Sequence, residues 1–537
     1  MRRFAFLFSA VALGFAAAGC LKRETAVQQG DREQILHRGI GYEVAELDPH
    51  VVTGIAEWNV LRALFEGLTT EDPVDLHPVP GVAERWDVSP DGTAYTFHLR
   101  ANARWSDGTP VTAQDFVGSY RRILTGSLGA DYANMLYILQ GAEAYHKGTL
   151  KDFGRVGVNA LDARTLRLTL EHAAPNFLAL ITTPPWLPVP IGTIEKFGGA
   201  AQRGSSWTRP ERIVGNGPFN LKKWQQNQVI VTEKSATYWD AATVRLKAIH
   251  FYPIDSVDAE ERAFRAGQLH VTEFIPFSKI DGYRREASQL LRIDPYLGTY
   301  FYRFNTRRAP FSDARIRRAL ALAVDREAIV TKILRGGQAP AFALTPPGTA
   351  GYTSVAKLPT DLALARRLLK EAGYDGGKGL PALELLYNNS ENHRLVAEAV
   401  QEMWRRDLGV EVRLVNQELK VTHAARRAGD FQILRSDWVG DYLDPQTFLD
   451  IFRGDSGNNY TGWSNADYDA ALFAAARTVD PAARNALFQK AEAILLEAAP
   501  IVPIYHYTHI FLKQPSVRGW NSTLLDHHPY KHVWLEK

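Results

Sequence analysis

The chain has 537 residues, of which 45% are hydrophobic and 23% are charged. That much apolar chain can bury large cores over roughly three or four domains' worth of sequence, which excludes disordered and low-complexity proteins. The formal net charge is only +3, and the Arg-Arg pairs are scattered among acidic residues. A protein that binds phosphates shows a clustered basic excess, so we expect no nucleic-acid partner.

The first 20 residues have the order of an export signal. Arg2 and Arg3 precede an uncharged, mostly apolar run that ends in small residues just before Cys20, the only cysteine. This order is typical of a secretory signal peptide over residues 1–19, and the sequence AAGC resembles the lipobox of bacterial lipoproteins. We expect a lipid on Cys20 and a polar tether over 20–33, so that the protein is periplasmic or in the cell envelope, anchored to the membrane. An ordinary signal peptide with an incidental cysteine is the alternative.

From about residue 34, strand and helix patterns alternate. Tyr95, Phe97 and Leu99 alternate with polar residues, which predicts a half-buried strand. Thr112 and, three residues later, Asp115 predict a capped helix. Further helices are predicted to follow a cap at Ser312 and over 361–372, 393–408 and 479–498, and strands over 165–170, 229–231, 296–305, 383–387, 410–415, 431–434 and 501–505. This alternation predicts α/β lobes with mostly parallel sheets.

No motif in the sequence indicates catalysis. A P-loop, an H-E-x-x-H and a G-x-S-x-G sequence do not occur. The sequence GDSG at 454–457 matches a protease motif, but it lies among helix-rich segments and turn formers, which favours a turn. His506 and His509 are three apart in a predicted strand and face opposite sides, so they suit no shared metal. We expect no enzymatic activity, no cofactor and no metal.

Several separated segments resemble those of one family. In chain order they are 47–50 (LDPH), 105–113 (WSDGTPVTA), 215–219 (GNGPF), 238–240 (YWD), 305–325 (NTRRAPFSDARIRRALALAVD), 438–445 (WVGDYLDP) and 501–505 (IVPIY). Together they resemble the OppA-like, family 5 solute-binding proteins of oligopeptide ABC importers, over essentially all of residues 34–537.

The resemblance implies a two-lobed α/β periplasmic-binding-protein fold of type II, with an extra sub-lobe and hinge closure over a buried ligand. Lobe 1 would comprise 34–292 with the sub-lobe at about 67–191, lobe 2 would comprise 293–501, and 502–537 would return to lobe 1. Implied partners are short peptides and the permease subunits of an ABC importer with its cytoplasmic ATPase subunits. We expect a monomer.

The resemblance also implies which residues bind the peptide. Asp441 matches the aspartate that pairs with the peptide's α-amino group, and Trp438 would pack against a ligand side chain. Family positions for cations that bind peptide carboxylates are matched by Arg435, Arg426, His393 and Arg308. For His393 and Arg426, a place on a helix surface is an equally good interpretation.

Four further positions would line the same cleft. Tyr132 and Tyr507 match aromatic hydroxyl positions, although each could equally be a core tyrosine. Leu419 stands where well-known members have tryptophan, which would give an aliphatic pocket wall. Thr53 stands where an acidic residue occurs, which weakens the case for a basic ligand side chain in that pocket.

The sequence thus predicts a lipid-anchored, extracytoplasmic binding protein that delivers short peptides to an ABC importer. An extracytoplasmic peptidase or hydrolase is one alternative, but it would need a nucleophile–base pair or a metal cluster. A ligand sensor with the same fold is the other.

Overall fold

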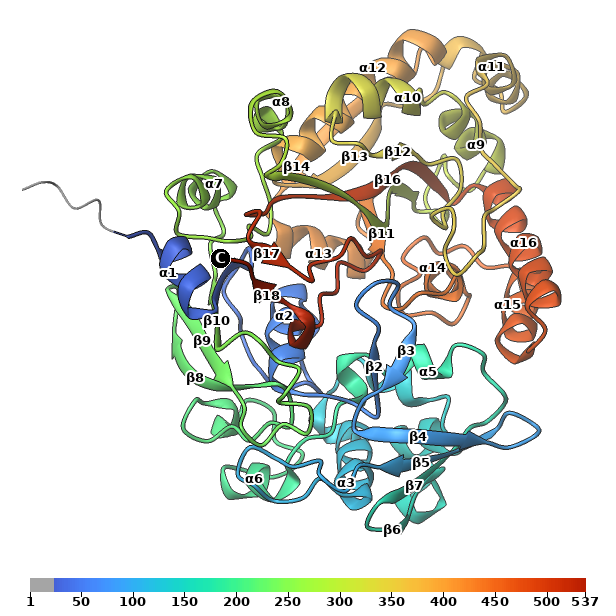
Figure 1. Ribbon diagram of the computed structural model, residues 1–537. Helices are drawn as coiled ribbons and strands as arrows, with labels where there is room; N and C mark the ends of the chain where they lie inside the picture. Colours follow the sequence, from blue (N-terminus) through green and yellow to red (C-terminus); the bar gives the residue numbers. More distant parts are fainter. Residues whose placement is uncertain (1–23) are drawn as a thin grey trace, which may run out of the picture.

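Two long strands cross the molecule and connect its two halves (Figure 1). The computed structural model describes residues 24–537, so the predicted signal peptide and Cys20 lie outside the described residues. The crossing strands are β11 (Leu291–Phe304) and β16 (Ile501–Leu512), which pair antiparallel with an irregular register between Pro295 and Thr299. Among residues 24–537, no helix is both long and apolar enough to cross a membrane.

The second lobe is built on a mixed six-stranded sheet. Its strands lie in the order β12 (Ala339–Pro340), β16, β11, β15 (Ile433–Val439), β13 (Leu383–Asn388) and β14 (Val412–Gln417). Strand β13 is parallel to both β14 and β15, whereas the other neighbours are antiparallel.

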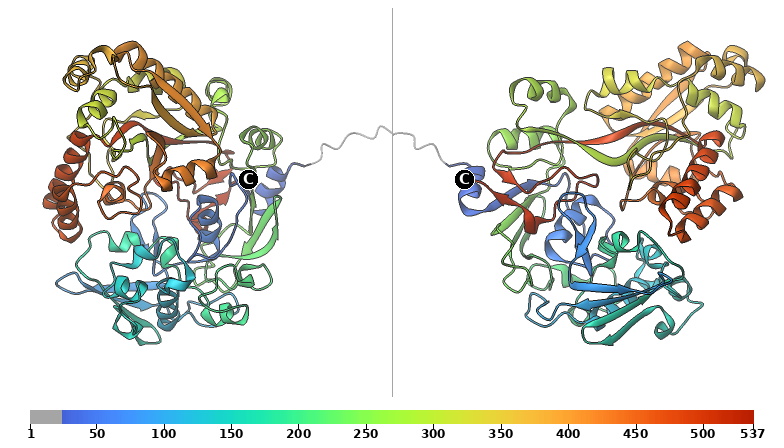
Figure 2. Two further views of the ribbon diagram at one scale, coloured as in Figure 1. Left: turned by 180° about the vertical axis from the view of Figure 1, so that it is seen from behind. Right: turned by 45° about the vertical axis from the view of Figure 1, so that its right-hand side comes forward.

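Helices cover both faces of this sheet, as Figures 1 and 2 show. One face carries α9 (Ala314–Leu322), α10 (Arg326–Ala328), α11 (Leu362–Glu371) and α12 (Glu391–Leu408). The other carries α13 (Leu419–Ala428), α14 (Gln446–Leu449), α15 (Ala466–Arg477) and α16 (Pro481–Ala498). Side chains alternate along β11, so Tyr300 and Tyr302 pack in the hydrophobic core between the sheet and α12. Phe301 packs in the core on the opposite face, which also contains Phe488 of α16.

The first lobe contains two four-stranded sheets and two short ribbons. One sheet has the order β1 (Ile35–Gly39), β10 (Ala248–Tyr252), β9 (Val229–Lys234), β8 (Phe219–Gln225), and the other β4 (Ala83–Val88), β5 (Ala94–Leu99), β7 (Thr165–Thr169), β6 (Val158–Asp162). The ribbons pair β2 (Thr69–Glu71) with β3 (Pro78–Pro80) and β17 (Val517–Arg518) with β18 (Trp534–Leu535).

The α-helices of this lobe come from residues 26–286. They are α1 (Ala26–Glu33), α2 (Ile55–Leu64), α3 (Ala113–Ile123), α4 (Ala142–His146), α5 (Phe177–Leu180), α6 (Ile191–Lys196), α7 (Val257–Arg265) and α8 (Phe277–Glu286). One hydrophobic cluster runs from Leu36 through Phe97 and Trp186 to Val533. The segment predicted as a sub-lobe, 67–191, therefore shares its core with the rest of the lobe.

Several local predictions are confirmed. The predicted strand matches β5, where Tyr95, Phe97 and Leu99 are buried. Thr112 and Asp115 form the predicted capping box of α3. Both patterns depend on residues close in sequence, which is why they could be identified without the fold.

The prediction of mostly parallel sheets is wrong. The sheet of β4 to β7 is entirely antiparallel, and in the sheet of β1 only the β1–β10 pair is parallel. A strand pattern in the sequence reports which side chains are buried, whereas strand direction depends on how the connections run in space.

Two boundaries also differ from expectation. The segment expected to be a tether contains α1, capped by Thr25; Val27 of this helix is packed and its N–H donates to Gly267 O at 2.9 Å. The helix after Ser312 is capped by Asp313 instead.

The return to the first lobe, expected at residue 502, lies nearer the middle of β16. Val502 and Tyr505 pack in the second lobe's core, and Ile510 packs in a cluster with Phe264 of α7 and Ile280 of α8. The strand itself therefore carries the chain from one lobe to the other.

Candidate ligand-binding site

The candidate site lies at the carboxyl ends of three neighbouring strands of the second lobe. Strand β13 leads into α12 and His393, β14 leads into α13, and β15 leads into the loop of Asp441. In α/β sheets, ligands bind outside the carboxyl ends of parallel strands, where the loops converge. The sheet topology therefore gathers residues from three distant parts of the sequence at one edge.

Asp441 is a half-buried carboxylate without a cationic partner. Its Oδ1 accepts a hydrogen bond from the Tyr132 hydroxyl at 3.5 Å, and its N–H donates to Thr447 Oγ1 at 3.2 Å. Among the described residues 24–537, it forms no ion pair. Burial raises the pKa of Asp441 to about 7, although hydrogen bonds from Tyr132 and Thr447 oppose this rise. The site thus lacks one positive charge close to this carboxylate.

The loop that carries Asp441 is held by a buried ion pair. Asp444 accepts two hydrogen bonds from Arg484 of α16, at 2.5 and 3.0 Å, and also caps the next turn through the N–H of Gln446. Trp438 donates from Nε1 to Thr447 at 3.5 Å and packs against the core of Phe301. In this structure Trp438 is therefore partly a core residue.

Asp441 lies where the two lobes meet. Tyr132 belongs to the first lobe, where its ring packs 5.8 Å from that of Trp58. Tyr442, next to Asp441, packs against the first lobe's core. Burial and the neighbouring Asp441 carboxylate both raise the pKa of Tyr132, which stays a hydrogen-bond donor. A change in the spacing of the lobes would therefore change the surroundings of Asp441.

A second group forms on the α12 face of the sheet. Arg435 donates to Asp437 Oδ2 at 3.1 Å and to the Tyr507 hydroxyl at 2.9 Å, and its guanidinium lies 4.8 Å from the ring centre of Tyr300. The Tyr507 hydroxyl donates to the same oxygen of Asp437 at 3.2 Å. Burial opposes the charge of Asp437, but Arg435 holds the pKa of that carboxyl below its usual value.

Gly298 permits this arrangement across β11. A Cβ atom at this position would lie 2.9 Å from the Tyr507 ring and 3.3 Å from the backbone oxygen of Trp438. The absence of a side chain therefore lets Tyr507 of β16 reach over β11 to Arg435 of β15.

His393 belongs to this second group but is uncharged. Its ring lies 5.6 Å from Tyr300, and its Nδ1 is buried without a hydrogen-bond partner. Burial, followed by the charge of Arg435, lowers the pKa of His393 to about 3. This burial disfavours the cation that the resemblance implies and favours a neutral His393 ring beside Tyr300.

Three expected residues lie near this edge without joining either group. Arg426, in the last turn of α13, lies 4.7 Å from the ring centre of Tyr460, and its Nε is buried without a partner. Leu419 begins α13 and is 46% exposed, which suits a wall more than a core. Thr53 is exposed just before α2 in the first lobe.

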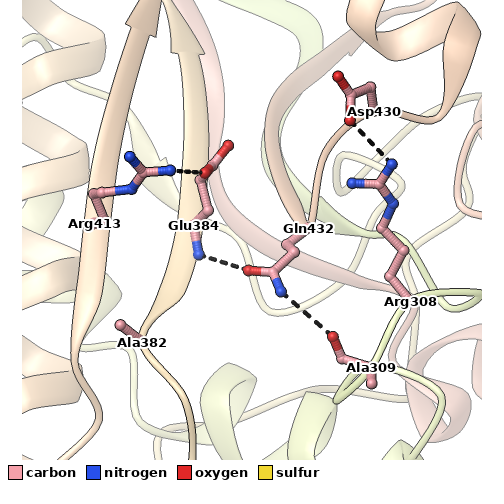
Figure 3. A pocket seen from close by; sticks show the side chains of 7 residues that line it. All are labelled: Arg308, Ala309, Ala382, Glu384, Arg413, Asp430 and Gln432. Atoms are coloured by element: carbon pink, nitrogen blue, oxygen red, sulfur yellow. Dashed lines mark hydrogen bonds and ion pairs between the residues drawn. The ribbon is translucent and has the colours of Figure 1, made fainter.

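Arg308 lies at the opposite edge of the sheet. It pairs with Asp430 at 3.0 Å and lines a pocket of about 660 Å³ together with Glu384, Arg413 and Gln432 (Figure 3). These residues stand at the amino ends of the strands, roughly 20 Å from the carboxyl ends at 3.3 Å per residue. The structure therefore separates Arg308 from the other expected site residues.

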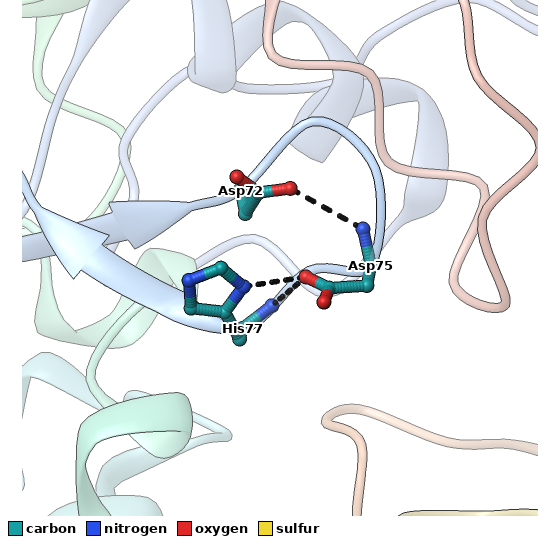
Figure 4. A group of neighbouring side chains, drawn as sticks. All are labelled: Asp72, Asp75 and His77. Atoms are coloured by element: carbon teal, nitrogen blue, oxygen red, sulfur yellow. Dashed lines mark hydrogen bonds and ion pairs between the residues drawn. The ribbon is translucent and has the colours of Figure 1, made fainter.

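A cluster of possible metal ligands lies in the β2–β3 turn. Oxygen and nitrogen atoms of Asp72, Asp75 and His77 lie within 4.8 Å of one another (Figure 4). Asp75 Oδ1 already accepts hydrogen bonds from the N–H and Nδ1 of His77, and Asp72 accepts one from Val74. These contacts are those of a tight turn, and we assign the cluster no ligand.

Two residues of the site were missed in the sequence. Asp437 stands two positions after Arg435 in a strand, and a period of two places both on one face, so the signal was present. Thr447 contacts Asp441 only because the loop folds back, which no periodicity indicates.

Known proteins resemble the chain over nearly its whole length. The family model for bacterial extracellular solute-binding proteins, family 5, matches residues 77–460. The periplasmic oligopeptide-binding protein OppA of Escherichia coli is 39% identical over 503 residues, 91% of this chain and 90% of that protein. The probable deoxycholate-binding periplasmic protein YgiS of the same species is 37% identical, over 91% and 90%.

A solved structure has the same fold. The murein tripeptide binding protein MppA of Escherichia coli superposes with a TM-score of 0.83 at 36% identity, covering 94% of this chain and 99% of that one. The agreement confirms the predicted two-lobed α/β architecture.

Proposed function

The chain belongs to the bacterial extracellular solute-binding proteins of family 5, and we propose that it binds short peptides between its lobes and delivers them to an ABC importer. The family consists of binding proteins, not enzymes. In this proposal the protein performs no chemistry on its ligand. Its work is to enclose the ligand and to present the closed form to the permease.

The single observation that carries the proposal is the unpaired carboxylate of Asp441 at the meeting of the lobes. A peptide brings an α-ammonium group, which supplies the positive charge that the site lacks. Because Asp441 contacts Tyr132 of the first lobe, a ligand held by Asp441 would lie beside the contact between the lobes. The ammonium group of the peptide would therefore both anchor the peptide to Asp441 and favour closure of the two lobes.

Names of the relatives support a peptide more than other solutes. OppA and MppA are named for peptides, whereas YgiS is named as a probable deoxycholate-binding protein. Deoxycholate is an anion without an ammonium group, and an unpaired carboxylate repels it. Asp441 is therefore better matched to a peptide.

A variant of Asp441 tests the proposal. We expect Asp441→Asn to weaken binding of tri-alanine by about 2–5 kcal/mol, because the buried ammonium loses its charged partner. Isothermal titration calorimetry measures the change, with Asp430→Asn as a matched control at the far edge of the sheet. An unchanged affinity in Asp441→Asn would show that Asp441 does not hold the amino group.

The natural ligand can be identified directly. Residues 21–537, expressed in soluble form and purified without denaturant, should release a ladder of short peptides on unfolding in native mass spectrometry. Release of a steroid acid or another non-peptide solute instead would overturn the peptide assignment and leave the family unchanged.

The proposal also includes a lipid on Cys20 that anchors the protein to a membrane in the periplasm or cell envelope. The lipobox-like sequence AAGC supports it. Labelling of cells with an alkyne fatty acid should mark the wild type and not Cys20→Ser, which should appear in the soluble fraction. Equal labelling of both would contradict the anchor.

A further inference from the structure

Only one of the two carboxylate oxygens of Asp437 is hydrogen-bonded within the described residues. Arg435 and Tyr507 both bind its Oδ2, whereas its Oδ1 makes no hydrogen bond among the described residues 24–537. The side chain of Asp437 is 41% exposed, compared with 11% for Arg435. The pair therefore presents its negative partner to solvent and keeps its positive partner inside.

The internal pair changes what Arg435 can do for a ligand. Its guanidinium already donates to Asp437 and Tyr507 and stacks on Tyr300. A ligand carboxylate that approached it would have to displace or share these partners, and it would meet the like charge of Asp437. Arg435 is therefore poorly available as an anion site.

Among the described side chains, the groups that contact this pair add no positive charge on this face. His393 is neutral, and burial keeps the hydroxyls of Tyr300 and Tyr505 protonated. Arg303 lies on the other face, where it bonds Ser436 and packs on Tyr460, the ring that Arg426 also contacts. The charges of Arg435 and Asp437 cancel, and the exposed oxygen of Asp437 leaves the surface of the group negative.

We propose that Asp437 determines specificity, so that the site prefers a peptide with a lysine or arginine side chain beside Arg435 over one with an acidic side chain there. This inference rests on the proposed function and names its substrate class. A ligand cation would bind Oδ1 of Asp437 without breaking the pair with Arg435. Asp437 and Asp441 would then recognise two different positive groups of one ligand.

Charge-scanned tripeptides test the inference. Tri-alanine and its variants with lysine or glutamate at position 2 or 3 are titrated into the wild type, Asp437→Asn and the control Asp430→Asn, which loses a carboxylate paired with Arg308. At whichever of positions 2 and 3 places its side chain beside Arg435, we expect the wild type to bind the lysine peptide at least tenfold more tightly than the glutamate peptide. In Asp437→Asn this ratio should fall below threefold or invert, because Arg435 is released. Asp430→Asn should keep it.

Each outcome separates this inference from the function on which it rests. Equal affinity of the wild type for the lysine and glutamate peptides at both positions would overturn the inference, as would a ratio that Asp437→Asn preserves. In both cases binding of tri-alanine would leave the peptide function standing. If the wild type bound no peptide at all, both would fall. Equal melting temperatures of the two asparagine variants and the wild type would show that the comparison is between folded proteins.

Discussion

Two regions of the second lobe use aspartate in opposite ways. Where the lobes meet, Asp441 has no cationic partner, and burial raises its pKa to about 7. Inside the lobe, Asp444 is bound by both terminal nitrogens of Arg484. The two aspartates stand only three positions apart in the sequence. The comparison shows that pairing, not residue type, separates a carboxylate that holds the fold from one that awaits a ligand.

The largest expected difference between the two aspartates is in their contribution to stability. We expect Asp444→Ala to lower the free energy of unfolding by about 3–5 kcal/mol, because Arg484 would stay buried without its partner. Asp441→Asn should cause no such loss, since it replaces an unpaired carboxylate with a neutral group. Urea unfolding followed by tryptophan fluorescence measures both. A similar loss in the two variants would show that Asp441 is also a structural residue.

A pH series sharpens the comparison. Unliganded Asp441 is largely protonated below pH 7, and a peptide ammonium binds its ionised form, so binding at acid pH must first remove this proton at the expense of affinity. We expect peptide affinity to fall by up to tenfold per pH unit as the pH drops below about 7.

Titration calorimetry at pH 5.5, 6.5 and 7.5 measures this dependence, and proton release shows in buffers of different ionisation enthalpy. Asp441→Asn should flatten it. Affinity that rises with acid would contradict the sign and the assignment.

The contact between the lobes predicts a smaller effect. Tyr132→Phe removes the hydroxyl that donates to Asp441 and should weaken peptide binding by about 1 kcal/mol, a typical value for one hydrogen bond. Calorimetry on the purified variant tests it, with Tyr137→Phe as a control tyrosine of the same segment. Unchanged binding in Tyr132→Phe would mean that the hydroxyl does not take part in the closed state.

The smallest effect is expected at Arg308. Because it pairs with Asp430 at the opposite edge of the sheet, Arg308→Ala should leave peptide affinity within twofold of the wild type. The exposed ion pair itself should contribute no more than about 1 kcal/mol to stability. A tenfold loss of affinity would restore Arg308 to the binding site and contradict its separation from Asp441.

The sequence could predict those features that depend on near neighbours. The capping box of Thr112 and Asp115 and the alternation at Tyr95, Phe97 and Leu99 are properties of a few consecutive residues. Strand direction was predicted wrongly because it depends on the paths of the connections.

For the candidate site residues, the sequence indicated the chemical type of each side chain but neither its charge nor its place in the fold. His393 is a ring that could carry a charge, yet burial beside Arg435 lowers its pKa to about 3. Arg308 is an available cation in the sequence, but the structure pairs it with Asp430 at the edge of the sheet opposite to Asp441.

The sequence by itself determined the family, the order of the elements and the presence of Asp441 in its motif, because these follow from local pattern and from resemblance. Only the tertiary structure decided which carboxylates are paired. Arg484 reaches Asp444 from 40 residues away, and Tyr132 reaches Asp441 from 309 residues away. Coulomb energy and desolvation depend on distances in space, and chain folding sets these distances without regard to separation in the sequence.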